Sequence, residues 1–282
     1  MASAVTGGAR IPLDTRFQET VAPLFVTGMG TEHVGPLLYH LVRMTKPRRA
    51  LEVGLGYTSP FLAQALADNA VEDRDDRRIV AEAPADDMRR NLLRDEYFRE
   101  ARAPRLHAID DHSGEGSSAP AVLATLDSLG LSDIVHVHKA DFRGYAAKLD
   151  RADLPLDFVW FDAGGPLEYI DFLAEYWPLI SQNHGLLLLH YTYWHLTTTY
   201  QGREVSSMLC GSIANEIKRQ QLRAGTAARF EVLSLLEPHK TRQGSVTMVR
   251  KLPGTSLCRD RDFREEMLEI YGSTPPPMPV LR

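Results

Sequence analysis

Short apolar runs alternate with helical stretches from about Arg48 to about Lys251, and no other feature limits the possible folds as strongly. Such runs are typical of a parallel sheet covered by helices on both faces. The polar link PHKTRQG joins the last two runs and predicts an antiparallel hairpin at one sheet edge. We therefore expect an α/β fold with a doubly wound, mostly parallel seven-stranded sheet, with strands at Ala50–Val53, Leu106–Ile109, Ile134–His138, Phe158–Phe161, Leu186–His190, Phe230–Leu236 and Ser245–Arg250.

The segments before and after this alternation are expected to belong to the same domain, residues 1–282. Residues 1–47 read as an N-terminal helical arm, in which Thr31 caps a helix that runs to Met44. Residues 252–282 read as an amphipathic helix followed by an extended, proline-rich tail. The chain is thus predicted to be one domain with a helical extension at each end.

Residues 69–105 read as a helical insertion, because they separate a predicted short helix, Pro60–Ala67, from the second strand. The insertion opens with the charged run VEDRDDRR, and apolar residues from Met88 to Phe98 recur at helical spacing. One interpretation is a solvated surface helix. The other is a lid or dimer element that covers the carboxyl ends of the strands.

Composition narrows the class of partner. The chain has 282 residues, of which 44% are hydrophobic and 24% are charged, and its net charge is −5. An acidic chain lacks the positive field that attracts phosphate backbones, so we do not expect a nucleic-acid partner. The two cysteines, Cys210 and Cys258, have no metal-binding or redox spacing, and no apolar run is long enough to span a membrane. These features favour a cytoplasmic enzyme with a small-molecule substrate, and they leave a homodimer open.

The sharpest local motif is RRALEVGLGYTSPFLAQAL, in which a strand runs into Gly54 and Gly56. Missing Cβ atoms allow a tight turn and let a ligand approach the backbone. Ser59 is placed to cap a helix that begins at Pro60, so that free amides face the turn. The motif indicates a nucleotide-binding turn, with a purely structural turn as the alternative. A dinucleotide is disfavoured, because Ser59 occupies the position of the third glycine of that fingerprint.

Together with three later blocks, this motif resembles the class I S-adenosylmethionine-dependent methyltransferases. The blocks are the E-x-G-x-G motif from Glu52 to Gly56, an acid closing the second strand in LHAIDDHSG, an acid after the third in VHVHKADFRGY, and DFVWFDAGG at the fourth. The resemblance covers about Thr31 to Lys251. It implies S-adenosylmethionine as cofactor and a seven-stranded sheet.

The resemblance also implies roles for individual residues. The glycine turn would hold the methionine part of the cofactor, the acid after strand two its ribose hydroxyls, and the acid after strand three its adenine amine. Alternatively, these acids are turn formers or helix caps. By position the cofactor-binding candidates are Glu52, Gly54, Gly56, Tyr57, Thr58, Asp110 with Asp111 as its substitute, Asp141, Phe142 and Asp162.

The segment TEHVGPLLYHLVRMTKPRRALEVG further resembles the small-molecule O-methyltransferases related to the catechol and caffeoyl-coenzyme A enzymes. That subfamily binds a divalent metal through an Asp after strand four and an Asp-Asn pair after strand five. Asp162 matches the first position, but His190 and Tyr191 replace the pair, and two oxygen ligands are lost. We therefore predict no obligatory magnesium and assign no metal-binding residue.

We expect proton transfer by a side chain to take the place of metal-assisted chemistry. His190 ends the fifth strand, where an imidazole can accept a proton from a nucleophile. The catalytic candidates are His190, Asp162, Tyr191 and His195, within an aromatic cluster that adds Tyr193, Trp194 and Tyr200. The alternative is a half-buried strand end. A second histidine group, His107, His112, His136 and His138, has no carboxylate or cysteine at metal-binding spacing, and we do not interpret it as a metal site.

The sequence thus predicts a metal-independent S-adenosylmethionine-dependent methyltransferase that modifies an oxygen or nitrogen of a small molecule. One alternative uses the same cofactor as substrate, by cyclising its amino acid part and releasing methylthioadenosine. Another is a non-catalytic binding subunit with the same fold. An NAD-dependent oxidoreductase is disfavoured by Ser59 and by the position of Glu52.

Overall fold

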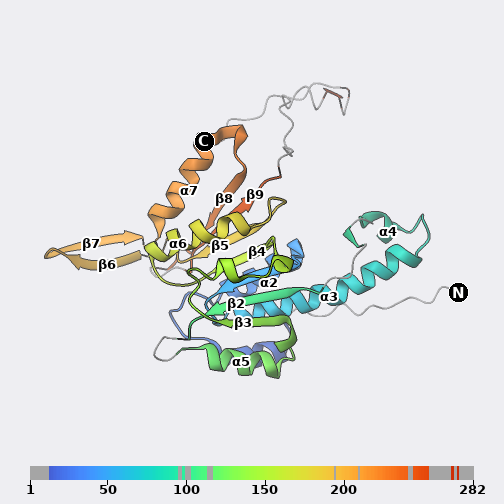
Figure 1. The fold of residues 1–282 in the computed structure, drawn as a ribbon, viewed down its shortest axis with the longest axis horizontal. Helices are drawn as coiled ribbons and strands as arrows, with labels where there is room; N and C mark the ends of the chain where they lie inside the picture. Colours follow the sequence, from blue (N-terminus) through green and yellow to red (C-terminus); the bar gives the residue numbers. More distant parts are fainter. Residues whose placement is uncertain are drawn as a thin grey trace.

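The computed structural model of the chain describes residues 13–94, 97–98, 103–112, 117–193, 195–208, 210–240, 244–253, 268–269 and 272. Its centre is a seven-stranded sheet with helices on both faces (Figure 1). In spatial order the strands are β3 (Val135–Lys139), β2 (Arg105–Asp110), β1 (Arg49–Val53), β4 (Phe158–Phe161), β5 (Leu186–His190), β9 (Val246–Lys251) and β8 (Phe230–Leu235). The first five are parallel, whereas β9 runs antiparallel to both β5 and β8. The predicted fold class and edge hairpin are confirmed, and each predicted strand end lies within one residue of the observed end.

Two helical layers sandwich the sheet. Side chains from α2 (Val34–Thr45), α3 (Ser59–Glu82) and α5 (Ala119–Ser128) pack on one face, next to the short α1 (Thr15–Val21). The other face is covered by α6 (Pro166–Tyr176) and α7 (Gly211–Ala224). Central strands such as β4 and β5 are buried along their whole length, which explains why they read as unbroken apolar runs.

A second, two-stranded sheet lies outside the predicted architecture. It consists of β6 (His195–Tyr200) and β7 (Arg203–Met208), which form an antiparallel hairpin between β5 and α7. Figure 1 shows this hairpin projecting from the body of the molecule. Both residues of its turn have positive φ, +50° at Gln201 and +73° at Gly202, as the preferred two-residue hairpin turn requires. Neither strand of this hairpin is among the seven predicted strands.

The predicted short helix after β1 is wrong in length, because α3 continues from Ser59 to Glu82 and contains the charged run. α3 begins at the carboxyl edge of the sheet and runs back along the strands, so its second half extends past the amino edge (Figure 1). There Asp73 and Asp76 are buried, and their carboxylates lie 3.4 and 3.2 Å from Lys46 Nζ, just before β1. The acidic run therefore neutralises a lysine at the amino edge.

The rest of the insertion follows α3 to this amino edge. α4 is confined to Met88–Leu92, and both of these end residues are largely exposed. Tyr97 donates a hydrogen bond from its hydroxyl to the carbonyl of Lys46. The interpretation of the insertion as a lid over the carboxyl ends is therefore wrong, because the described parts of it pack at the opposite edge.

The terminal extensions are described only in part. α2 begins at Val34, whose backbone N–H donates to the carbonyl of Thr31. The Thr31 hydroxyl makes no hydrogen bond within the described structure, so the predicted side-chain cap is wrong. The predicted C-terminal helix lies outside the described residues, apart from the helical pair Leu268 and Glu269. Within the described ranges, no helix combines the length and apolar character needed to cross a bilayer.

Candidate active site

The candidate site lies at the carboxyl edge of the sheet, where β1 stands between β2 and β4. The chain crosses from one side of β1 to the other at this point, and open α/β sheets bind ligands at such reversals of strand order. The glycine turn follows β1, and acids follow β2, β3 and β4. His190 ends β5. The topology thus gathers the predicted residues along one edge.

Two glycines shape the turn in different ways. Gly54 has φ +96°, and a Cβ there would lie 2.6 Å from the carbonyl oxygen of Asp162, so only glycine fits between β1 and β4. At Gly56, by contrast, no atom of the described residues lies within 4 Å of the position of an added Cβ. The space in front of Gly56 is open, as a backbone cradle for a ligand needs to be.

Asp110 ties the glycine turn to the end of β2. Its two carboxylate oxygens accept hydrogen bonds from the backbone N–H of Leu55, at 2.8 Å, and of His112, at 2.7 Å. Ser118, which precedes α5, donates to the carbonyl of Leu55 at 2.7 Å. Each carboxylate oxygen keeps a free lone pair, so Asp110 can still accept from a hydroxyl. Asp111 beside it is exposed.

Glu52 is fully buried below the same turn. Its Oε1 accepts from the Thr58 hydroxyl at 2.9 Å, whereas its Oε2 is buried without a hydrogen-bond partner in the described structure. Burial, opposed by hydrogen bonds from Ser59 and Thr58 and reinforced by nearby carboxylates, raises the pKa of Glu52 to about 8. Glu52 therefore offers a protonated, half-satisfied carboxyl at neutral pH. Ser59 does not cap the helix as predicted, since its Oγ accepts from the N–H of Gly56.

Tyr57 joins the glycine turn to the N-terminal segment. Its ring lies 5.0 Å from the Phe61 ring and 5.8 Å from the Phe25 ring. Burial, with a contribution from the charge of Glu32, raises the pKa of Tyr57. The segment before α2 therefore forms part of the wall of the site.

The two residues predicted to meet adenine differ in their surroundings. Asp141 follows β3, is exposed, and holds the guanidinium of Arg143 at 2.6 Å, which lowers the pKa of Asp141. Phe142 instead lies in the core, with its ring 5.3 Å from that of Phe161. Of the two, only Asp141 presents its side chain at the surface.

Asp162 and His190 form a pair between β4 and β5. The Nδ1 atom of His190 lies 2.8 Å from Asp162 Oδ1, and the imidazole is completely buried. Its Nε2 atom has no hydrogen-bond partner within the described structure. A carboxylate at Nδ1 favours a proton on that nitrogen and leaves a lone pair on Nε2, the form that accepts a proton.

Tyr191 covers this pair. It has a left-handed backbone, with φ +50°, and its ring centroid lies 3.5 Å from that of His190. The Tyr191 ring also lies beside Gly30, where an added Cβ would come within 3.1 Å of it. Gly30 packs so tightly on Gly244 that a Cβ on Gly244 would overlap the Gly30 carbonyl. Burial, together with the charges of Asp162 and Glu32, raises the pKa of Tyr191, so its hydroxyl stays protonated.

The predicted aromatic cluster is only partly described. Tyr193 turns toward α7, where its hydroxyl bonds Asn215 and Lys218. His195 begins β6, but its side chain lies outside the described structure, as do those of Trp194 and Tyr200. The gathering of these side chains into one pocket remains a prediction.

Sequence reasoning missed the N-terminal segment around Gly30 and Glu32 as a wall of the site. Glu32 pairs with Lys240, which is 208 residues away along the chain. The one local signal was the glycine-rich stretch TGMGTE ahead of α2.

The second histidine group lies within the sheet. His107 and His138, on adjacent strands, place Nδ1 and Nε2 3.0 Å apart, and the Tyr145 hydroxyl lies 2.8 Å from His138 Nδ1. Burial lowers the pKa of both histidines. These contacts occupy three of the four ring nitrogens of the pair, and the fourth, His107 Nε2, lies 3.3 Å from Asp153 Oδ2. That this group binds no metal stays a prediction.

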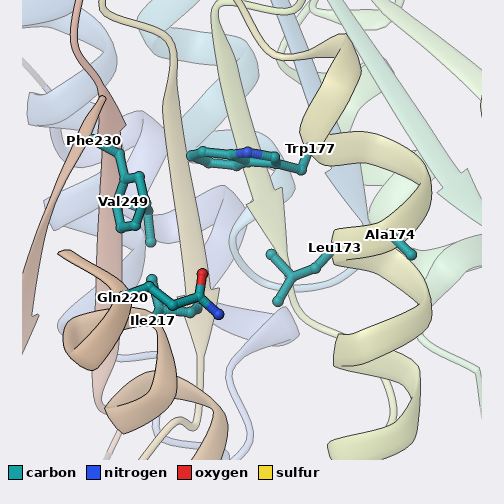
Figure 2. Close-up of a pocket in the computed structure, with 7 residues that line it drawn as sticks. All are labelled: Leu173, Ala174, Trp177, Ile217, Gln220, Phe230 and Val249. Atoms are coloured by element: carbon teal, nitrogen blue, oxygen red, sulfur yellow. The ribbon is translucent and has the colours of Figure 1, made fainter. Parts of the chain in front are cut away.

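A separate cavity of about 290 Å³ lies between α6, α7 and the β8–β9 hairpin. Figure 2 shows Trp177 and Phe230 facing across it, with Gln220 as its polar lining residue. Trp177 follows the far end of α6, and Phe230 pairs with Lys251 at the amino edge. This cavity therefore does not belong to the candidate site.

No protein-family model matches the chain, and no curated protein matches it. Solved structures do: the fold is that of the S-adenosylmethionine-dependent O-methyltransferases. The chain is similar to the O-methyltransferase TomG from Streptomyces achromogenes, involved in tomaymycin synthesis and crystallised with S-adenosylmethionine, at 18% identity and TM-score 0.52, with 85% of this chain and 96% of TomG covered.

Two further structures agree. An O-methyltransferase from Bacillus cereus, in complex with S-adenosylhomocysteine, is 16% identical with TM-score 0.50, and 87% of this chain and 94% of that chain are covered. Cofactor-bound Rv0187 from MTB is 12% identical with TM-score 0.52, covering 84% and 88% of the two chains. At these identities the likeness concerns the fold, and the chemistry must be argued from the site.

Proposed function

We propose that this protein is a methyltransferase that uses S-adenosylmethionine to methylate an oxygen or nitrogen atom of a small molecule. The observation that carries the proposal is the open backbone cradle at Gly56, with the half-satisfied carboxyl of Glu52 below it and the Asp110 carboxylate beside it. The ammonium group of such a ligand would favour the ionised form of Glu52, whose Oε2 then accepts from it, and the free lone pairs of Asp110 fit ribose hydroxyls.

In this proposal the edge from β1 to β3 holds the cofactor. Gly54, Gly56 and their neighbours Tyr57 and Thr58 surround its methionine part, with Glu52 beneath. Asp110, or Asp111 next to it, accepts from the ribose hydroxyls, and Asp141 with Phe142 defines the adenine end. When bound, the cofactor supplies an electrophilic methyl group on a sulfonium.

The proposed base is the Nε2 atom of His190. It accepts the proton of the acceptor hydroxyl or amine while that atom forms a bond to the methyl carbon and the carbon–sulfur bond breaks, leaving a thioether. Asp162 holds the imidazole through Nδ1 and stabilises the imidazolium that forms. Because the Tyr191 ring covers the imidazole, acceptor binding must shift this ring. His195 is a further candidate from the start of β6.

Metal independence is part of the proposal, and the donor set supports it. Asp162 Oδ1 already pairs with Nδ1 of His190. His190 and Tyr191, which stand in place of the Asp-Asn pair, carry an imidazole and a phenol, and burial raises the pKa of the phenol. Hard cations such as Mg²⁺ prefer several oxygen ligands. Turnover should therefore persist in the presence of a chelator.

A second candidate reaction is favoured by the complete burial of His190. A base closed off from bulky acceptors suits an intramolecular step, in which the cofactor amine attacks its own γ-carbon. A carbon–nitrogen bond forms, the carbon–sulfur bond breaks, methylthioadenosine leaves and His190 takes the ammonium proton.

Mass spectrometry of the products distinguishes these reactions. The purified protein is incubated with S-adenosylmethionine, alone and with a panel of small phenols, acids and amines. Methyl transfer yields S-adenosylhomocysteine only with an acceptor, whereas cyclisation yields methylthioadenosine without one. Tight cofactor binding without turnover would indicate a binding subunit, and absence of cofactor binding by calorimetry would refute the proposal.

A further inference from the structure

Three side chains outside the proposed chemistry bring metal-ligating atoms together. His33, Glu237 and His239 each offer one ligand atom, and these atoms lie within 4.8 Å of one another. Among these atoms, His33 Nε2 lies 3.8 Å from Glu237 Oε1. Both histidines are exposed, so solvent ions reach them, whereas Glu237 is partly buried.

The fold fixes the direction of the carboxylate. Glu237 follows β8, and its Oε2 accepts from the N–H of Gly244 at 2.7 Å, which leaves Oε1 facing His33. His239 is two residues further along the same link, and His33 immediately precedes α2. Two segments that are far apart in the sequence therefore bring their metal-ligating atoms close together.

From this convergence we propose that His33, Glu237 and His239 bind a divalent transition-metal ion of the zinc class at the rim of the candidate active site. Two imidazoles and one carboxylate suit Zn²⁺ and its neighbours rather than Mg²⁺ or Ca²⁺, which prefer oxygen donors throughout. Three protein ligands leave a fourth position for water. Neither Asp162 nor His190 takes part, so the site is separate from the methyl-transfer step.

Lys240 is the competing cation. Its Nζ lies 2.9 Å from Glu237 Oε1 and also pairs with Glu32. A metal on Oε1 displaces the ammonium from Glu237, while Glu32 retains it. The site therefore accommodates the ion without leaving the lysine unpaired.

The position suggests what the metal does. It would tie the segment before α2 to the link between β8 and β9, and these same two segments meet at Gly30 and Gly244 against the Tyr191 ring. A bound ion would hold the wall that covers His190, and so act as a tether and not as a catalyst.

Calorimetry with zinc chloride on untagged, chelator-treated protein tests the proposal. We expect one Zn²⁺ per chain, and His33→Ala and His239→Ala should each weaken binding by more than about tenfold, the loss that removal of even an outer-shell partner causes. His40→Ala, which removes an exposed histidine from α2, is the matched control and should bind as the unaltered chain does. Co²⁺ should give a visible absorption band that both ligand variants lose.

A second readout separates this site from the proposed function. Zn²⁺ should raise the melting temperature of the unaltered chain and not that of His33→Ala, while both should bind S-adenosylmethionine equally. Equal zinc binding by the unaltered chain and both ligand variants, or no binding by the unaltered chain, would overturn the proposal. Failure to bind S-adenosylmethionine would instead count against the methyltransferase assignment.

Discussion

The two halves of the carboxyl edge are built differently. On the side of β1 and β2, the backbone of Leu55 is held at both polar groups, by Asp110 and Ser118, and Gly54 is locked against β4. On the side of β4 and β5, a buried imidazole nitrogen has no partner in the described structure, and Tyr191 adopts a left-handed backbone.

This difference separates a preformed half from an incomplete one. A turn whose backbone groups are satisfied costs little to order when a ligand binds, and here only the Glu52 carboxyl below the turn keeps an oxygen without a partner in the described structure. Unsatisfied polar atoms and backbone strain persist where the surrounding structure enforces them, and they are found at functional sites. We infer that the first half binds the cofactor and that the second half binds the methyl acceptor. Four substitutions test this division.

The largest effect is expected at the incomplete half. His190→Gln should lower kcat by about 10²–10⁴, because the proposed general base is lost. Affinity for S-adenosylmethionine, measured by calorimetry, should not change. His40→Gln is the control for loss of an exposed imidazole. A parallel loss of binding and turnover in His190→Gln would remove the division of roles.

Gly54→Ala should instead damage the fold of the preformed half. The substitution forces a residue with a Cβ to φ +96° and against the Asp162 carbonyl, and the expected loss of unfolding free energy is about 3 kcal/mol. Gly202→Ala, at φ +73° but in open space, should cost less. Urea denaturation of both variants checks the prediction, and equal losses would mean that the contact with Asp162 contributes nothing.

Asp110→Ala should weaken cofactor binding by about 1.5–3 kcal/mol, the range for hydrogen bonds to charged groups. It also frees the N–H of Leu55, so a smaller loss of stability should accompany it. Asp111→Ala is the matched comparison, since that residue is the alternative ribose ligand. A larger effect at Asp111 would transfer the assignment to it.

The smallest effect, taken per pH unit, concerns the pH dependence of stability. The folded-state pKa of Glu52 is raised to about 8, so the folded chain keeps a proton that the unfolded chain releases above its ordinary value of 4.5. Stability is therefore lost as pH rises toward 8, by up to about 1.4 kcal/mol per pH unit. Glu52→Gln should flatten this slope in urea titrations from pH 5 to pH 8. An unchanged slope would mean that Glu52 is ionised in the folded protein.

The preformed half could be predicted because its signal is contiguous. One stretch from β1 into α3 contains the strand, both glycines and the start of the helix. Buried strands can be recognised in the sequence as apolar runs. The acids at the ends of β2, β3 and β4 follow from the same pattern. Local spacing is enough where neighbours in sequence are neighbours in space.

In the other half Asp162, His190 and Tyr191 could be predicted from the strand ends, but the segments that surround them could not. The contact of Gly30 with Gly244, and the pairing of Glu32 with Lys240, join segments that no local pattern relates. The lid interpretation placed the insertion at the wrong edge, because its position depends on how far α3 continues. The β6–β7 hairpin was not predicted, and its strands pair with one another in a separate two-stranded sheet.

Calorimetric titration of S-adenosylmethionine into the unaltered chain and Gly56→Ala tests the central claim most directly. The added methyl group meets no protein atom of the described structure and needs no positive φ, so the variant should fold and melt normally. We predict one cofactor per unaltered chain and at least about a tenfold loss, or about 1.4 kcal/mol, in the variant. Equal affinity in both proteins, or no binding by the unaltered chain, would contradict the account.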